Sequence, residues 1–168
     1  ELDGELITCP KYPDGFDGKS YYDRLRQGAV VKTSLINSEG FYQAFRPYVE
    51  AGKDILYVGI SSGISGTVGA ANLAGRQLME EFPERSVLVV DSMGAGLGTG
   101  ILTCKAADYR NEGMHAAEAA ELLKMLSDKN VRLVLAYQFE NPEKAFTASS
   151  VAAKVGISEE EAKDALEK

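Results

Sequence analysis

The sequence contains little cysteine and histidine, no excess of basic residues and no long apolar run. Cys9 and Cys104 lie far apart, with no further thiol or histidine at metal-ligand spacing, so we expect free thiols in a reducing cytosol and no bound metal. No stretch approaches the roughly 18 apolar residues of a membrane span, and no signal core follows the N-terminus. The net charge of −7 disfavours nucleic acid and anionic membranes. We therefore expect a cytoplasmic protein with no nucleic-acid partner and no membrane insertion.

The groups that many enzymes need are also missing. A serine nucleophile needs a base, and the single histidine, His115, stands at the start of a predicted helix, where we expect a solvated structural residue. No pair of carboxylates ends adjacent predicted strands. The lysine and glycine spacing of a P-loop and the G-x-G-x-x-G pattern of dinucleotide sites are absent. The sequence thus predicts no catalytic residue, no cofactor and no enzyme that works alone.

The apolar pattern predicts a layered α/β fold. With 168 residues, 45% of them hydrophobic, the chain can bury one principal core. Apolar runs without polar alternation are typical of strands buried on both faces, and these runs alternate with helical segments. We expect strands at residues 54–60, 86–90 and 131–137, and helices at residues 66–81, 98–110 and 115–126. The sheet is therefore expected to be mostly parallel, with helices on both faces.

The flanking segments carry shorter signals. We expect a strand at residues 6–9, a helix at 19–27 that stops at Gly28, and a helix from the N-cap Ser38 to Gly52. After Pro142 we expect a helix at 143–155 and a last helix capped by Ser158, with the spacing of a helix-turn-helix. The acidic charge of that last helix favours a packing hairpin over DNA binding. The predicted division is an α/β domain at 1–139 and a helical tail at 140–168.

Two predicted strands end in loops rich in small residues. In Ile-Ser-Ser-Gly-Ile-Ser-Gly-Thr at 60–67, the unpaired N–H groups of the next helix, its dipole and the hydroxyls of Ser65 and Thr67 would suit a phosphate or carboxylate. A plain strand-to-helix turn would use the same residues. The glycines at 94–100 would admit a ligand closely, or equally allow tight helix packing. Asp91 is expected to cap the helix that follows, or to position Ser92.

The order of these pieces resembles the DegV family. The resemblance runs over residues 16–137 and rests on Thr33-Ser34, then Phe41 and Phe45, then Ile-Ser-Ser-Gly-Ile-Ser-Gly-Thr at 60–67, then Val-Val-Asp-Ser and a glycine-rich helix start at 89–98. It implies a protein that binds a long-chain fatty acid and serves in some bacteria as the acyl-carrying subunit of a fatty acid kinase, whose ATP-binding subunit is separate. It also implies that the carboxylate is held by Thr33, Ser65 and Gly66, with a supporting loop of Ser34, Ser62, Thr67, Asp91 and Ser92.

The sequence departs from the family pattern at both ends. The family's T-D-S strand is not seen before Glu1, and its G-G-R-I and H-T-G-P-G segments are not seen after Tyr137. We therefore expect the N-terminal domain of such a protein, with the second domain truncated or replaced. Two other functions stay open: an α/β domain of a phosphotransfer enzyme acting on small hydroxylated substrates, and an interaction domain.

Overall fold

The computed structural model describes residues 1–7, 15–144 and 146–167. The chain forms two compact units, Glu1–Leu35 and Ile36–Lys168. Of the strand predicted at residues 6–9, residues 8 and 9 lie outside the described residues, and Leu6 and Ile7 form no strand. The domain boundary predicted between residues 139 and 140 stays a prediction.

The first unit is built around one short helix. Helix α1 (Gly18–Arg26) confirms the helix predicted at 19–27, and its N-cap Asp17 accepts a hydrogen bond from the Ser20 N–H at 3.0 Å. Gly28, with φ +95°, follows the end of the helix as predicted. The side chain of Leu2 is buried, and its backbone bridges to Glu5 and Val31. Among the described residues of this unit, Leu2 is the only buried hydrophobic side chain.

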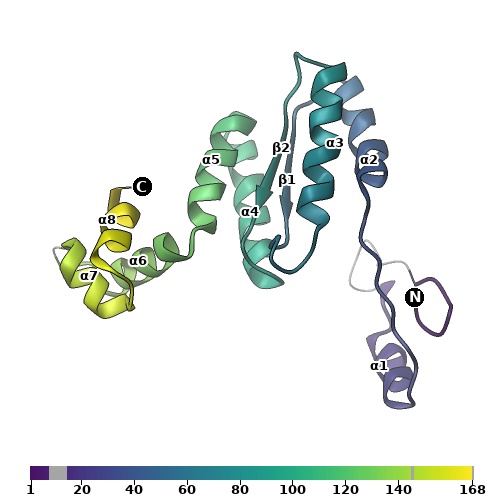
Figure 1. Ribbon diagram of the computed structural model, residues 1–168, viewed down its shortest axis with the longest axis horizontal. Coiled ribbons are helices and arrows are strands. Elements are labelled where there is room, and N and C mark those ends of the chain that lie inside the picture. The colour runs from purple at the N-terminus through teal and green to yellow at the C-terminus, as the bar shows by residue number, and fades with distance from the viewer. Residues whose placement is uncertain (8–14, 145, 168) are drawn as a thin grey trace. The chain divides into compact units, whose positions relative to one another are not determined.

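The second unit contains the predicted α/β layers (Figure 1). Its elements are α2 (Ser38–Glu50), β1 (Ile55–Gly59), α3 (Thr67–Glu81), β2 (Val87–Asp91), α4 (Leu97–Asn111) and α5 (Ala116–Ser127). The two strands are parallel, with Ile55 opposite Val87 and Gly59 opposite Asp91. In Figure 1, α2 and α3 lie on one side of the strands and α4 and α5 on the other. The α/β class with helices on both faces of a parallel sheet is confirmed.

The strands are apolar throughout because both of their faces are covered. Ile55, Tyr57, Val87 and Val89 point into the cluster formed with α2 and α3. The alternate residues Leu56, Val58, Leu88 and Val90 point into the cluster formed with α4 and α5. This alternation explains why the sequence shows continuous apolar runs rather than a polar face.

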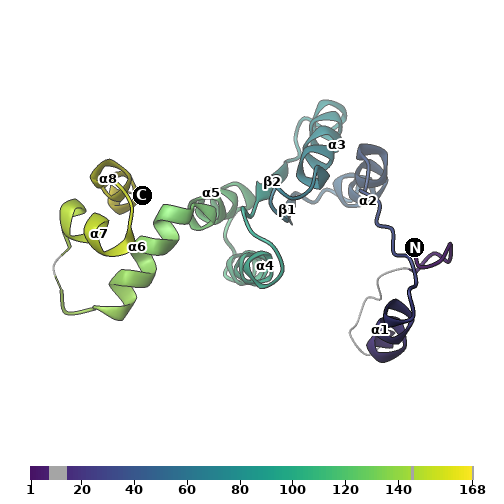
Figure 2. The ribbon, with the colours of Figure 1, turned by 60° about the horizontal axis from the view of Figure 1, so that its bottom comes forward.

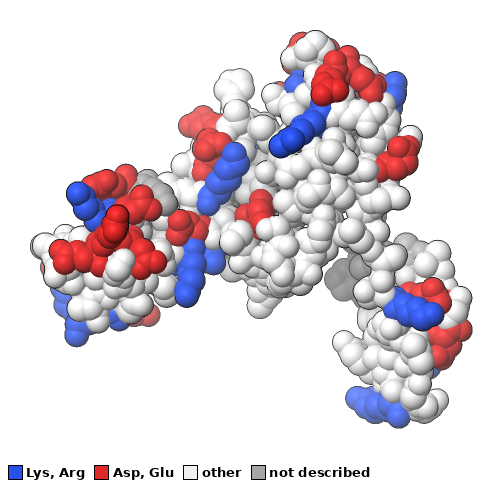
Figure 3. Space-filling view, in the orientation of Figure 1, with Lys and Arg blue, Asp and Glu red and all other residues white. Residues whose placement is uncertain are grey.

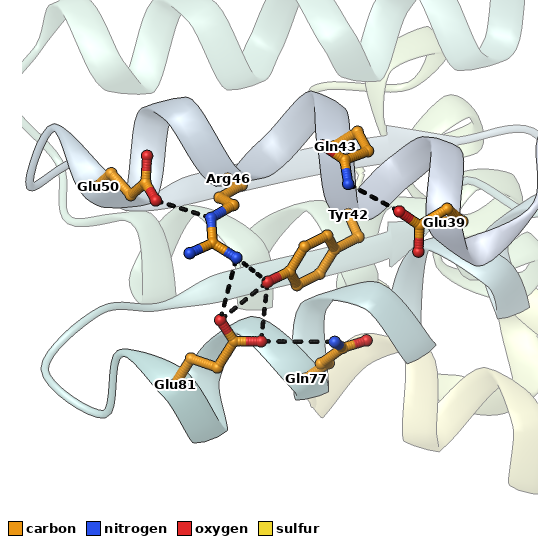
Figure 4. A network of polar contacts seen from close by, with 7 residues as sticks. All are labelled: Glu39, Tyr42, Gln43, Arg46, Glu50, Gln77 and Glu81. Carbon is orange, nitrogen blue, oxygen red and sulfur yellow. Dashed lines mark hydrogen bonds and ion pairs between the residues drawn. The ribbon is translucent and has the colours of Figure 1, made fainter.

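Helix α2 is joined to α3 by apolar packing and by a polar network at its edge (Figure 4). Phe41, Phe45 and Val49 are buried against α3. Asn37 rather than the predicted Ser38 is the N-cap, and its side chain accepts from the Gly40 N–H at 2.8 Å. The buried Tyr42 hydroxyl contacts both carboxylate oxygens of Glu81 at 2.9 and 2.8 Å.

Arg46 completes this network. It donates to the Tyr42 hydroxyl and, at 2.7 Å, to Glu50. The hydrogen bond to Glu81 and burial raise the pKa of the Tyr42 phenol, while the Arg46 guanidinium acts in the opposite direction. The network therefore fixes the neutral phenol of Tyr42 between the two helices.

The strand predicted at 131–137 is wrong, because these residues form helix α6 (Lys129–Glu140). Asp128 caps the helix by accepting from the N–H groups of Asn130 at 2.8 Å and Val131 at 3.2 Å. Val131 and Val134 are three residues apart, so they share one helical face, and both are buried. Their partners come from α7 (Ala148–Val155) and α8 (Glu159–Glu167), which gather around α6 in Figure 2.

The predicted hairpin at the end of the chain is confirmed as two packed helices. Thr147 and Ser150 form a capping box at the start of α7, which begins five residues later than the helix predicted at 143–155. Gly156 ends α7 in the left-handed conformation, with φ +76°. The Ser158 hydroxyl accepts from the Glu161 N–H at 3.1 Å, as expected of the cap of α8.

Gly59 is predicted to be essential for the packing of α3 on the strands. An added Cβ would lie 2.6 Å from Val68 Cγ2 and 3.0 Å from Tyr57 Cε1, so Gly59→Ala should lower the free energy of unfolding by about 1 to 3 kcal/mol. Gly69→Ala is the matched control, since a Cβ there meets nothing within 4 Å and gains about 1 kcal/mol of helix propensity. Urea denaturation of both variants checks this, and equal effects would contradict the packing role.

Candidate functional site

The two loops that follow β1 and β2 lie against each other at the carboxyl edge of the sheet. The Ser61 N–H donates to the Gly94 carbonyl at 2.8 Å, and the Ser92 N–H donates to the Gly59 carbonyl at 3.1 Å. Residues 60–66 and 92–96 are therefore bonded to each other directly. Ligands of open α/β sheets commonly bind at this edge, so the structure places the predicted loops where a site is expected.

Asp91 ties the loops together rather than capping the next helix. Its carboxylate accepts from the Ser62 N–H at 3.1 and 3.3 Å and from the Met93 N–H at 2.9 Å. The expectation that Asp91 caps α4 is wrong, because the N-cap there is Gly96, which has no side chain to accept a bond. Partial burial raises the pKa of Asp91, but the hydrogen bonds from Ser62 and Met93 outweigh it and lower the pKa overall.

Ser92 has a buried structural hydroxyl. Its side chain is 1% exposed, and its Oγ contacts Thr99 Oγ1 at 2.9 Å and donates to the Gly94 carbonyl at 3.2 Å. Sequence reasoning did not single out Thr99 or the buried Ser61, whose Oγ accepts from the Gly63 N–H at 3.2 Å. For Ser61, the signal that could have found it is its position just after a buried strand, where small polar residues must satisfy turn amides. For Thr99, the signal is a hydroxyl in the first turn of α4, within reach of the preceding loop.

The start of α3 supplies donors that have no partner among the described residues. Ser65 Oγ and Thr67 Oγ1 are 2.7 Å apart, and Ser65 Oγ also accepts from the Thr67 N–H at 3.3 Å. The N–H groups of residues 61–65 have acceptors as well. Among the described residues, the N–H groups of Gly66, Val68 and Gly69 meet no acceptor. The predicted anion site is thus narrowed to the Ser65 hydroxyl and the first-turn amides beginning at Gly66.

The glycine-rich start of α4 is open rather than tightly packed. A Cβ added at Gly98 or Gly100 would meet nothing within 4 Å in the described part of the chain. The packing interpretation of these two glycines is therefore wrong. Apolar side chains stand out on the same loops and helix start: Ile64 is 65% exposed, Met93 58%, Leu97 87% and Ile101 65%. An uncovered apolar surface thus lies on the same pair of loops as the unpaired donors.

Thr33 and Ser34 belong to the first compact unit, and both are exposed. The donors at the start of α3 belong to the second unit. The structure thus brings together Ser62, Ser65, Gly66, Thr67, Asp91 and Ser92. The participation of Thr33 and Ser34 stays a prediction.

His115 and Cys104, for which the sequence predicts no catalytic or metal-binding role, lie outside the two loops. His115 is exposed at the N-cap of α5, and Cys104 is an exposed free thiol on α4. Within the described ranges, no three His, Cys, Asp or Glu side chains gather as metal ligands would, and no helix is long and apolar enough to cross a membrane. On the face seen in Figure 3, basic and acidic side chains stand next to each other instead of forming one basic surface.

Comparison with known proteins agrees with this fold. Residues 10–141 match the family described as "Uncharacterised protein, DegV family". A DegV domain-containing protein of Clostridium perfringens is 31% identical over 154 residues, which are 89% of this chain and 53% of that protein. The chain therefore spans about half the length of this curated relative.

Two solved structures share the architecture. One is described as fatty acid binding of a DegV family protein from Thermus thermophilus; it is 33% identical with a TM-score of 0.55, over 65% of this chain and 38% of that one. The other is a Streptococcus pneumoniae fatty acid kinase B3 protein loaded with linoleic acid, 23% identical with a TM-score of 0.52, over 64% of this chain and 37% of that one. The latter shows the shared fold.

The fold and the loops define an α/β domain with an open helix N-terminus at the carboxyl edge of a parallel sheet. The family match covers most of the chain and includes both loops. The chain belongs to the DegV family.

Asp91→Asn is predicted to destabilise the protein at neutral pH. The free energy of unfolding of this variant should also depend less on pH in the acid range. The folded pKa of Asp91 lies below its usual value of about 3.9, so its stabilisation is present above that value and is lost as the pH falls through the folded pKa. We expect a loss of about 1 to 2 kcal/mol at pH 7 that shrinks toward pH 2. Denaturation at a series of pH values measures this. Asp108→Asn, which removes a solvent-exposed carboxylate 3.6 Å from Lys105, is the control and should change little.

Proposed function

We propose that this chain binds a long-chain fatty acid by its carboxylate. In this proposal one carboxylate oxygen accepts hydrogen bonds from the Ser65 hydroxyl and the Gly66 N–H, and Thr33 supplies a further hydroxyl. The observation that carries the proposal is the set of unpaired donors at the start of α3, beside exposed apolar side chains. A helix N-terminus favours a negative charge, and hydrogen bonds to an ionised acceptor are stronger than neutral ones.

The hydrogen bonds that the loop amides already make favour a small anionic group, such as a carboxylate, over a larger one, such as the phosphates of a nucleotide. The Asp91 carboxylate accepts a hydrogen bond from the Ser62 N–H, and the Ser61 carbonyl and Oγ accept hydrogen bonds from the N–H groups of residues 63–65. The amides that remain lie in the first turn of α3. Such a narrow set of donors suits the two oxygens of a carboxylate, whereas the loops that hold nucleotide phosphates present a longer run of free amides.

The exposed apolar side chains suit the acyl tail. Ile64 and Met93 lie in the two loops, while Leu97 and Ile101 are one helical turn apart on α4. Each buried CH₂ group contributes about 0.8 kcal/mol, so a long tail would supply most of the affinity. The solved relative from Thermus thermophilus is described by its fatty acid binding, which agrees with this choice of ligand.

We further propose that the chain presents its fatty acid to a separate kinase subunit that binds ATP and transfers the phosphoryl group. This role follows from the family resemblance and from a site that would hold the carboxylate at an open edge of the sheet. In the same proposal, residues 1–139 form the head-group domain and residues 140–168 a helical tail.

Protein purified from bacterial cells is predicted to carry an acyl chain. Native mass spectrometry should show a mass above that of the polypeptide, and organic extraction should release a free fatty acid of the same excess mass. A clean apo mass that stays unchanged after incubation with oleate would overturn the proposed function.

Loss of either proposed hydroxyl should weaken fatty-acid binding. Ser65→Ala and Thr33→Val each remove a hydrogen bond to a charged group, worth about 1.5 to 3 kcal/mol, so the dissociation constant for oleate should rise about 10- to 100-fold. Calorimetric titration measures this, with unchanged thermal unfolding as the check on folding.

Two matched controls accompany these variants. Thr33→Ser keeps the hydroxyl and should retain affinity, and Ser20→Ala removes an exposed hydroxyl on α1 and should have no effect. Equal affinity of wild type, Ser65→Ala and Thr33→Val would refute the site.

A further inference from the structure

A hollow of about 690 Å³ adjoins the proposed carboxylate site. One side is lined by Val68, whose N–H is one of the donors at the start of α3 that meet no acceptor among the described residues. Asp91 and Met93 of the second loop line the same side. The opposite side is lined by the end of α5 and the beginning of α6. The hollow therefore connects both loops to a wall that the fatty-acid proposal does not use.

Three cationic side chains line the wall formed by α5 and α6: Lys124, Lys129 and Arg132. Arg132 Nη1 donates to the backbone carbonyl of Leu126 at 3.3 Å and to that of Ser127, so the end of α5 fixes where the guanidinium lies. A guanidinium has five N–H donors, which is more than these two carbonyls require. This wall therefore holds one positioned guanidinium beside two ammonium groups.

The acidic groups near these cations are already engaged in hydrogen bonds or exposed to solvent. Asp91 and Asp128 line the hollow, and both accept from backbone N–H groups of their own turns, Asp91 at 2.9 to 3.3 Å and Asp128 at 2.8 and 3.2 Å. Lys124 forms an ion pair with Glu121 at 2.7 Å, but both side chains are more than half exposed, so solvent weakens this pair. The charge of the hollow therefore favours an anion.

The hollow is also partly apolar. Val68, Val89 and Met93 line it between the charged groups. Apolar neighbours exclude water from part of the space, and a lower local dielectric strengthens the attraction between a bound anion and the three cations. An anion here would be held more firmly than one beside the same lysines on an open surface.

The phosphoryl transfer in the proposed function makes the lipid head group larger and more negative. A carboxylate oxygen forms a bond to the γ-phosphorus of ATP, the bond from that phosphorus to the β,γ-bridging oxygen breaks, and ADP leaves with the electron pair. A head group with one negative charge becomes an acyl phosphate with about two. The few amides at the start of α3 suit the carboxylate, so the added phosphoryl group requires further donors and positive charge nearby.

We infer that this hollow binds the phosphoryl group of the acyl phosphate. Arg132 donates to two of its oxygens, as a planar guanidinium can, while Lys129 and Lys124 add charge. The inference rests on the proposed function, because the acyl end of the product stays at Ser65 and Gly66. The wall of α5 and α6 then distinguishes the product from the substrate, since only the product reaches it.

Calorimetric titration with two lipids tests the inference. One is palmitate, and the other is the phosphonate analogue of palmitoyl phosphate, in which a CH₂ group replaces the oxygen between the acyl carbon and phosphorus. Combining Lys124→Gln with Lys129→Gln should raise the dissociation constant of the analogue about tenfold, because contacts to a charged group are lost. The dissociation constant of palmitate should change less than about threefold, since its carboxylate does not reach these lysines.

The matched control combines Lys154→Gln on α7 with Lys163→Gln on α8, which removes the same charge outside the hollow. It should leave the affinity for both lipids unchanged, and thermal unfolding checks that all variants are folded. The inference is overturned if the two double variants weaken the analogue equally, or if palmitate binds and the analogue does not.

Inorganic phosphate separates a lipid head group from a free ion. It should compete with the analogue only weakly, because it has no acyl tail, and not at all with palmitate. Inorganic phosphate that binds as tightly as the analogue would overturn the assignment to a lipid head group. If neither lipid binds the wild type, the palmitate titration overturns the proposed function and the inference fails with it.

Discussion

The pairing of Gly59 with Asp91 at the last position of the parallel ladder controls the rest of the site. It brings two loops that are about thirty residues apart in sequence to the same height at the edge of the sheet, so that Ser61 reaches Gly94 and Asp91 reaches Ser62. A shift of one residue would turn every strand side chain to the opposite face and separate these partners. The two apolar clusters therefore set the register of the strands, and this register determines how the two loops lie relative to each other.

The positions of the two loops could be predicted because their causes are local or periodic. Strands buried on both faces leave continuous apolar runs, and a turn of small polar residues between such a run and a helix places free amides at the helix start. These rules located Ser65 and Gly66 correctly at the beginning of α3. The exact helix caps were less predictable, since Asn37 and Ser38 are both good capping residues and only the backbone geometry chooses between them.

The predictions that were wrong depended on contacts distant in sequence. The segment Val-Arg-Leu-Val-Leu-Ala-Tyr suits a strand by composition, yet α7 and α8 give Val131 and Val134 a helical partner surface and Asp128 supplies the cap. Asp91 had a plausible local role as a cap, but its carboxylate is bonded across the sheet edge to Ser62, which no spacing rule foresees. The openness of Gly98 and Gly100 also depends on which surfaces lie nearby, a property of the whole fold.

In the proposed complex, the loops and the apolar surface contribute to binding in different ways. Each hydrogen bond to the carboxylate replaces one to water, so its net contribution is small compared with burying an acyl tail of many CH₂ groups at about 0.8 kcal/mol each. The donors at α3 therefore select the orientation and the charge of the ligand. Affinity depends on how completely the tail is covered.

Among the described residues Ile64, Met93, Leu97 and Ile101 offer one apolar side, each more than half exposed. A tail lying on one side would keep part of its surface in water and gain only part of the full burial energy.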